Sequence, residues 1–142
     1  MTFKIGMLIT IQHDIETSFE FYKNLGLTPK FHIKNRWAEF ELANTKLILC
    51  PTENELPERH TGIVLEVADL NKLYTELAAK NITFITAPKE APHGIMASII
   101  DPGHNIIDLY QPTHEKVAEI VRKAQDNCCN SEKSCKSDDK NC

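Results

Sequence analysis

The chain has 142 residues and a formal net charge of −4, with 42% hydrophobic and 25% charged residues. This length suits one domain, and this composition is typical of a globular protein. No cluster of Lys and Arg offers the basic face that nucleic acid requires, and no apolar run approaches the roughly 20 residues of a membrane span. The start of the sequence, Met1–Lys4, lacks the apolar core of a signal peptide. We therefore expect a cytoplasmic protein that binds neither nucleic acid nor membrane.

The first half of the chain predicts a βαβββ module at about residues 3–52. Asp14 is a good N-cap, and Gly26 is a natural residue for the C-terminal end of the helix. Between them, apolar side chains follow helical spacing at Ile15, Phe19 and Tyr22. The expected elements are a strand at 3–12, this helix, strands at 31–33 and 36–42, and a return arm at 46–50.

The second half predicts the same module again, at about residues 61–112, after a polar linker at 51–59. Asp69 takes the place of Asp14, and Leu70, Tyr74 and Leu77 repeat the helical spacing. The expected elements are strands at 63–67 and 82–85 on either side of a helix at 69–80, a loop at 87–94, and a hairpin of 95–100 with 105–110. The hairpin turn Asp101-Pro102-Gly103-His104 is a strong turn signal. A repeat of this length is a whole supersecondary module rather than a solenoid unit.

The C-terminal part predicts an amphipathic helix at 113–126, with an apolar stripe at Val117, Ile120, Val121 and Ala124. Residues 127–142 have little to bury, and we expect this tail to be disordered when free. Cysteine is concentrated there: Cys50 is the only one of the five outside the tail. Nothing indicates secretion, so we interpret the cysteines as reduced thiols.

Two segments resemble a known family. Phe21-Tyr22-Lys23-Asn24-Leu25-Gly26-Leu27 looks like the first helix of the vicinal oxygen chelate superfamily, which includes glyoxalases, bleomycin-resistance proteins and extradiol dioxygenases. The run from Asp101 to Leu109 resembles its closing hairpin. The resemblance covers about residues 3–112 and implies an α+β fold in which two βαβββ modules form a curled mixed sheet, a cup. It leaves open whether the modules pair within one chain or between two chains of a homodimer.

The resemblance also implies where a divalent metal would be bound, because the family's ligands come from the first and last strand of each module. The four positions fall at Met7 (or Gly6), Ile48, Gly62 (or Thr61) and Asp108. Only Asp108 is a ligand for a hard metal, whereas a catalytic site needs about three protein ligands. We therefore expect no metal cofactor in the cup, although an atypical site is an alternative. Its ligands would be Cys50, His60 and Asp108, a plausible zinc set by residue type.

A cup without metal suits a small organic molecule, because its floor is expected to be apolar. Aromatic rings and carboxylates beside this floor would also suit a ligand with positive charge. The candidate lining residues are Met7, Ile9, Trp37, Glu39, Ile48, Cys50, Asp108 and Tyr110. The alternative is that these are ordinary sheet residues, since a register slip of one residue would reverse every side chain.

The tail supplies a separate candidate site. Its thiols are Cys128, Cys129, Cys135 and Cys142. The spacing is not that of a zinc ribbon, but thiolates bind soft metal ions, so a soft metal on the tail is possible. Three functions follow: a metal-independent small-molecule-binding protein, which we favour; a glyoxalase-like lyase or dioxygenase with an atypical metal site; and a thiol-rich metal-handling protein.

Overall fold

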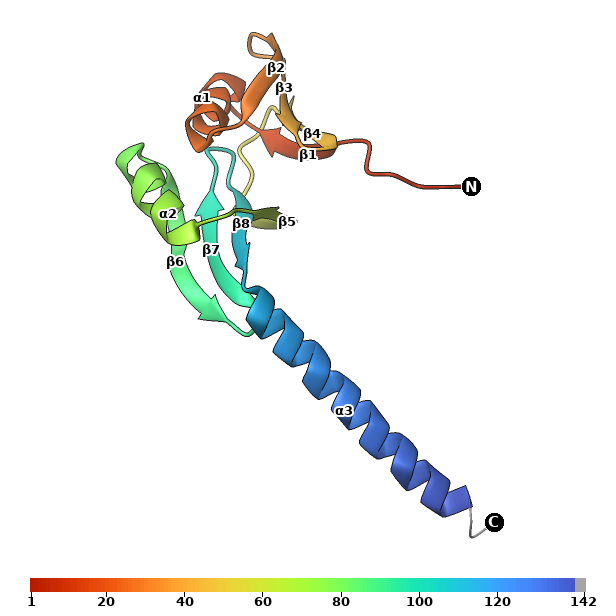
Figure 1. Cartoon of the computed structure of the whole chain (residues 1–142). Coiled ribbons are helices and arrows are strands. Elements are labelled where there is room, and N and C mark those ends of the chain that lie inside the picture. Colours follow the sequence, from red (N-terminus) through yellow and green to blue (C-terminus); the bar gives the residue numbers. More distant parts are fainter. Residues whose placement is uncertain (140–142) are drawn as a thin grey trace.

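The computed structural model describes the backbone of residues 1–139 and the side chains of residues 1–128. It contains two successive βαβββ modules and a long C-terminal helix (Figure 1). The first module comprises β1 (Leu8–Gln12), α1 (Ile15–Leu25), β2 (Thr28–Ile33), β3 (Trp37–Leu42) and β4 (Thr45–Pro51). The second comprises β5 (Arg59–Glu66), α2 (Leu70–Ala79), β6 (Thr83–Ala91), β7 (Gly94–Ile100) and β8 (Asn105–Pro112).

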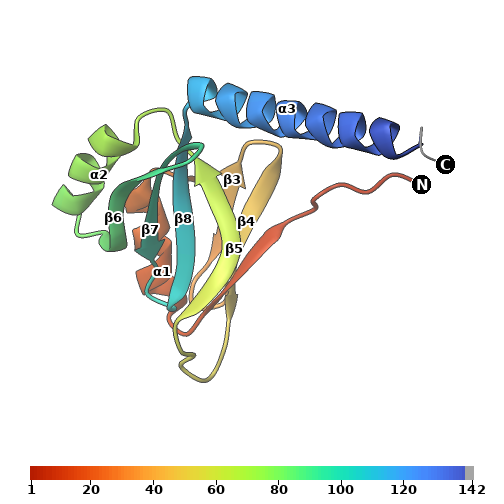
Figure 2. The same ribbon diagram turned by 90° about the horizontal axis from the view of Figure 1, so that it is seen from below.

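Each module forms its own four-stranded mixed sheet, and the two sheets have the same topology. The strand orders are β1-β4-β3-β2 and β5-β8-β7-β6. In each sheet the first strand runs parallel to the last, and the remaining pairs are antiparallel. The predicted fold class and the internal repeat are therefore confirmed. The strands β1 and β5 are edge strands, and in Figure 2 they lie on the same side of the molecule.

The helices α1 and α2 begin and end where the sequence predicts. The Asp14 carboxylate accepts a hydrogen bond from the backbone N–H of Thr17 (3.2 Å) at the start of α1, and Gly26 ends α1 with φ of 109°. Such a left-handed conformation is cheap only for glycine. Asp69 caps α2 in the same way, through the N–H of Lys72 (3.1 Å).

Several predicted strand boundaries are corrected, and β2 begins at Thr28 rather than at residue 31. β6 continues to Ala91, so the loop predicted at 87–94 is mostly strand. Its Pro88 is tolerated because β6 is an edge strand whose register shifts between Thr86 and Lys89. β1 begins at Leu8, opposite Leu47, rather than at residue 3. Its partner β4 begins only at Thr45, so the first predicted residues of the strand have no partner in this register. β5 begins at Arg59, the last residue of the predicted linker, rather than at residue 63.

One hydrophobic core serves both modules. The inner faces of the two sheets and the apolar stripes of α1 and α2 contribute to a single cluster of buried side chains. Its largest members include Tyr22, Phe40, Leu49, Leu70, Ile99 and Leu109. Burial of each such side chain stabilises the fold by roughly 1.5–3 kcal/mol, and residues of both modules share this cluster.

A buried polar network joins the end of β1 to the β7–β8 turn. The Asp101 carboxylate accepts hydrogen bonds from Gln12 Nε2 (2.7 Å) and from the Tyr22 hydroxyl (2.6 Å). The Asn105 backbone N–H donates to the same carboxylate (2.8 Å), and Arg59 Nη2 donates to the carbonyl oxygen of Ile11 (3.1 Å). Burial, followed by the negative charge of Asp101, raises the pKa of Tyr22 well above its ordinary value. The network holds β1 in place relative to the second module.

The last helix, α3 (His114–Asp139), projects from the body (Figure 1). It begins at the predicted place and continues past the predicted end at 126, into the segment predicted to be disordered when free. Residues 140–142 lie outside the described residues. Through Asp139, no helix has both the length and the apolar character needed to cross a membrane.

Candidate functional site

Each sheet has one face against the core and one face that we call the open face, turned away from the helices. Alternation along β1 shows the division: Thr10 and Gln12 are buried, whereas Ile9 and Ile11 are 50% and 41% exposed. Because strand side chains alternate, the open face of each sheet follows from its strand register.

The open face of the first sheet is mainly apolar and aromatic. Its central row runs across the four strands through Ile9, Ile48, Glu39 and Phe31. The Glu39 carboxylate lies 3.3 Å from Lys46 Nζ, and its side chain is largely buried. This ion pair neutralises the acid within the apolar surface.

Further candidates share this face. Cys50 pairs with Ile11 in the register of β1 and β4, and Trp37 pairs with Ile33 at the other end of the sheet. Burial raises the pKa of the Cys50 thiol, which favours the neutral form. A neutral thiol is a poor nucleophile and a poor metal ligand. Met7 lies just before β1 and is exposed.

The open face of the second sheet is more polar. The equivalent row runs through Val64, Asp108, Ser98 and Thr86. The Ser98 hydroxyl donates a hydrogen bond of 2.6 Å to the Asp108 carboxylate, which is half-buried. Within the part of the chain that the structure describes, this hydrogen bond occupies one carboxylate oxygen, and the second oxygen can still accept a hydrogen bond.

Tyr110 lies one row further along the second sheet, between Glu66 and Met96. Its ring packs edge-on against His93, with 5.2 Å between ring centroids. The eight predicted lining residues therefore divide between two open faces, with Asp108 and Tyr110 on the second and the others on or beside the first.

Neither open face assembles a metal-ligand set among the side chains of residues 1–128: no three His, Cys, Asp or Glu side chains come together there. Cys50, His60 and Asp108, the alternative zinc set, are accordingly not one group within a chain. Ile48 and Asp108, on the last strands of the modules, pair with Ile9 and Val64 on the first strands. Both of these first-strand neighbours are aliphatic. That the cup holds no metal cofactor stays a prediction.

Gly62 has a backbone role at one of the positions where the family resemblance implies a ligand. It has φ of 76° and lies where the register of β5 and β8 shifts between His60 and Val64. A residue with a side chain is strained in this left-handed conformation. The bulge therefore favours glycine at a place where a metal ligand would need a side chain.

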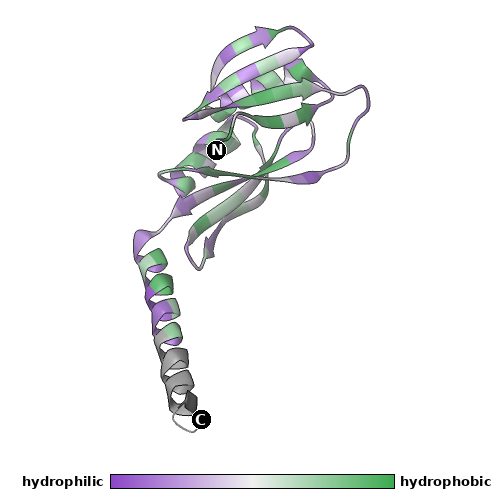
Figure 3. Ribbon diagram, turned by 90° about the vertical axis from the view of Figure 1, so that its right-hand side faces the viewer, coloured by the Kyte–Doolittle hydropathy of each residue, from purple (hydrophilic) through white to green (hydrophobic). Residues whose placement is uncertain are grey.

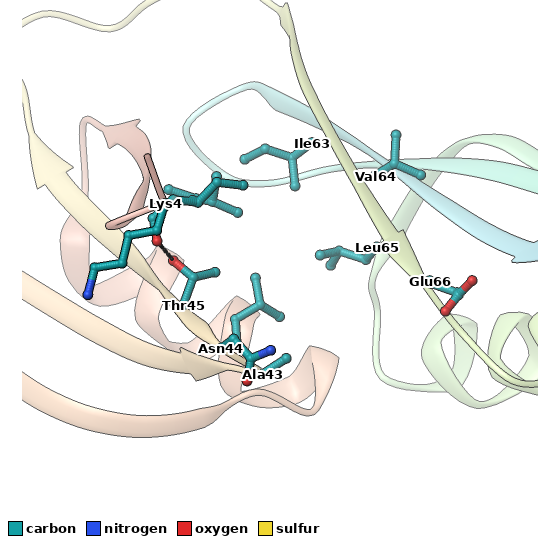
Figure 4. A pocket seen from close by; sticks show the side chains of 11 residues that line it. Lys4, Ala43, Asn44, Thr45, Ile63, Val64, Leu65 and Glu66 are labelled. Atoms are coloured by element: carbon teal, nitrogen blue, oxygen red, sulfur yellow. Dashed lines mark hydrogen bonds between the residues drawn. The ribbon is translucent and has the colours of Figure 1, made fainter. Parts of the chain in front are cut away.

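A groove of about 760 Å³ lies between the edge strands of the two sheets (Figure 4). Ile5 and Leu8 line one side, Val64 and Glu66 line the other, and the turn at Asn44 closes one end. None of the eight predicted lining residues contributes to it. Sequence reasoning missed these residues because the groove arises from the approach of two strands that are not hydrogen-bonded to each other.

Comparison with known proteins identifies the class. The model of the Glyoxalase/Bleomycin resistance protein/Dioxygenase superfamily matches residues 4–109, so the chain belongs to this family. No curated protein sequence matches it significantly. The predicted family resemblance is thereby confirmed.

Solved structures show the same fold at low sequence identity. The bleomycin-binding protein of Streptomyces verticillus, complexed with copper(II)-bleomycin, is 19% identical with a TM-score of 0.63, over 80% of this chain and 100% of that one. TnmS3, an antibiotic-binding protein from Streptomyces sp. CB03234, is 22% identical with a TM-score of 0.63, over 79% and 98%. Lactoylglutathione lyase from Agrobacterium tumefaciens is 16% identical with a TM-score of 0.65, over 78% and 94%. Binding proteins and an enzyme thus share this architecture, and the site must decide between them.

Proposed function

We propose that this protein binds a small organic molecule on the open faces of its sheets, without the divalent metal of the family's enzymes. The observation that carries the proposal is the exposed apolar surface of those faces. Ile9, Ile11, Phe31, Ile33 and Val64 are each between 41% and 53% exposed. Apolar side chains gathered on one face indicate an interaction site.

The polar groups on these faces suit a ligand with hydrogen-bond donors or positive charge. Asp108 is held by Ser98 and offers a carboxylate oxygen, while Trp37 and Phe31 offer aromatic surface. An apolar site with a few placed polar groups is typical of small-molecule binding. Similarity to a bleomycin-binding protein and to an antibiotic-binding protein supports this class of ligand.

We propose that two chains form the complete site as a homodimer. β1 and β5 are edge strands, and each borders an exposed open face. Covering these faces with a second copy would remove apolar surface from water at roughly 25 cal/mol per Å². Sedimentation equilibrium should give twice the mass of one chain, and a single-chain mass at all concentrations would reject the dimer. The cytoplasm remains our proposed location, where Cys50 would stay reduced.

Tryptophan fluorescence tests ligand binding directly, because Trp37 is the only tryptophan of the chain and lies on the open face. Titration with copper(II)-bleomycin should quench this fluorescence with saturation, and calorimetry should give the same dissociation constant. Free copper(II) is the control for quenching by metal alone. Absence of both saturable quenching and heat, repeated with a set of cationic aromatic antibiotics, would reject the proposed ligand class.

The second candidate is a metal-dependent lyase, favoured by the fold of the Agrobacterium enzyme and by the carboxylate of Asp108. It requires about three protein ligands around one ion. We expect no stoichiometric divalent metal in the purified protein by elemental analysis, and no formation of S-lactoylglutathione after addition of Zn²⁺ or Ni²⁺. One metal ion per chain together with turnover would replace our proposal by this one.

A further inference from the structure

A small cavity lies between the two modules, next to the groove shown in Figure 4. Its volume is about 160 Å³, and Leu42, Leu65 and Glu66 line both spaces. The cavity is therefore the inward continuation of the groove, and we call it the inner cavity. None of the eight lining residues predicted for the cup contributes to it.

The lining of the inner cavity is aliphatic and comes from both modules, whose strands carry hydrophobic stretches (Figure 3). Its half-buried apolar members are Leu25, Leu27, Leu42, Leu65, Val67 and Leu73. All six pack against the common core, and the fully buried Leu109 also lines the cavity. The cavity is thus an unfilled part of the apolar interior rather than a feature of the outer surface.

The end of α1 helps to leave this space unfilled. Gly26 lines the inner cavity and has φ of 109°, a left-handed conformation that favours glycine. A Cβ at Gly26 would meet no atom within 4 Å. The residue that ends the helix therefore contributes bare backbone to a place where a side chain would have room.

The inner cavity offers little to a polar or charged group. Among the lining residues that the structure describes, Glu66 is the only charged one. It pairs with Tyr110 in the register of β5 and β8, so strand alternation directs its carboxylate away from the side shared by Leu65 and Val67. Figure 4 shows Leu65 extending from β5 toward the groove. A buried water needs two to four polar partners, and the aliphatic side chains supply none.

We propose that the inner cavity binds an uncharged hydrocarbon group of about the size of benzene, as the anchor of a lipophilic small molecule whose remainder lies in the groove. Apolar cavities of about 150 Å³ stay dry and bind benzene, so a volume of about 160 Å³ fits one such ring. The groove, at about 760 Å³, has the volume of a small-molecule site. A charged anchor is disfavoured because an unpaired charge is costly away from water.

This site is separate from the open faces, because Leu65 and Val67 point to the other side of β5 from Val64 and Glu66. The ligand class also differs. The open faces suit a molecule with positive charge or hydrogen-bond donors, whereas the inner cavity suits only an apolar group.

The test titrates benzene into the full chain with isotope-labelled leucine methyl groups. The ring current of a bound benzene should shift the methyl resonances of Leu25, Leu27 and Leu73, with saturation at a dissociation constant of roughly 1 mM. The methyl groups of Leu47, which is buried in the first sheet and does not line the cavity, should shift much less.

Two variants fill the cavity from opposite modules. Leu27→Trp and Leu73→Trp should each weaken benzene binding by about tenfold, because the indole takes the space that the probe needs. The matched control Leu56→Trp makes the same change at a half-buried leucine outside the cavity, and should leave the dissociation constant within about twofold.

Absence of saturable shifts in the parent protein would overturn the proposal, and is the result expected if the N-terminal segment of a second copy filled the groove and the cavity. Unchanged affinity in both folded cavity variants would also overturn it, as would an equal loss in Leu56→Trp. The titration needs no ligand at the open faces, so its result stands whether or not copper(II)-bleomycin binds there.

Discussion

The two modules have the same topology and different open faces. The row Ile9–Ile48–Glu39–Phe31 of the first sheet and the row Val64–Asp108–Ser98–Thr86 of the second occupy equivalent strands. The first is apolar and its acid is paired with Lys46, whereas the acid of the second accepts a hydrogen bond from the Ser98 hydroxyl. The comparison teaches that the core residues specify the shared topology, while the open faces are free to differ in chemistry.

The largest expected effect comes from breaking the joint between the modules. Asp101→Ala removes the acceptor shared by Gln12 and Tyr22, so the buried Tyr22 hydroxyl loses this acceptor and Gln12 Nε2 keeps only its hydrogen bond to the Thr10 hydroxyl. The free energy of unfolding should fall by about 3–5 kcal/mol, measured by urea denaturation. Asp126→Ala, on exposed α3, is the control and should change it by less than about 0.5 kcal/mol. A small loss in Asp101→Ala would show that the apolar core alone joins the modules.

The apolar face of the first sheet is tested by Trp37→Ala. Loss of this ring should weaken binding of copper(II)-bleomycin by about 2 kcal/mol, roughly thirtyfold, as measured by calorimetry. Tyr110→Phe, which keeps the ring on the second sheet, should change affinity by less than about threefold. Equal losses in both variants would contradict the assignment of aromatic contacts to the first face.

β5 contains a bulge at Gly62, and the short strand β1 contains none. Substitution of Gly62 tests this difference between the backbones of the two modules. Gly62→Ala should lower the free energy of unfolding by about 1–2 kcal/mol through left-handed strain. A Cβ at Gly62 meets no atom within 4 Å, so a steric clash does not contribute. Gly6→Ala, equally open and without positive φ, should be neutral. An unchanged stability in Gly62→Ala would mean that the bulge rearranges.

The polar face of the second sheet is tested by Asp108→Asn. This change keeps the shape and removes the charge, and should weaken a cationic ligand by about 1 kcal/mol, roughly fivefold. Glu41→Gln removes an exposed carboxylate from the first sheet and should have less effect. Equal effects would indicate long-range attraction by net charge instead of contact with Asp108.

The smallest effect compares the two helix caps. Asp14 accepts hydrogen bonds from the backbone N–H and the hydroxyl of Thr17, and the pKa of Asp14 is lowered by these bonds. Asp14→Ala should cost about 1 kcal/mol, slightly more than Asp69→Ala. Because the folded pKa is lowered, the contribution is complete above the ordinary value of 3.8 and is lost as the pH falls below it.

The pH dependence of this cap can be isolated with Asp14→Asn, which still accepts a hydrogen bond and does not titrate. Unfolding by urea between pH 5 and pH 3 should show a shallower loss of stability in this variant than in the parent protein. Parallel pH profiles would show that the cap is not coupled to the protonation of Asp14.

Much of this fold was predictable from local signals. The caps at Asp14 and Asp69, the glycine at the end of α1 and the turn that begins at Asp101 each act within a few residues, and each lies where the sequence predicts. The repeat of these signals predicts two equal modules. The length of β6 was missed because the proline that indicates a loop is acceptable on an edge strand, and edge position is decided by the sheet.

The sequence by itself determined the order of elements and the family, because capping, turn geometry and apolar periodicity are local properties of the chain. Only the tertiary structure decided which side chains share an open face, since register depends on partner strands distant in sequence. It also decided that Asp101 is buried against Tyr22, 79 residues away, and that a groove lies between two edge strands. A buried carboxylate needs donors that only the folded chain brings together, and a groove exists only after two surfaces have met.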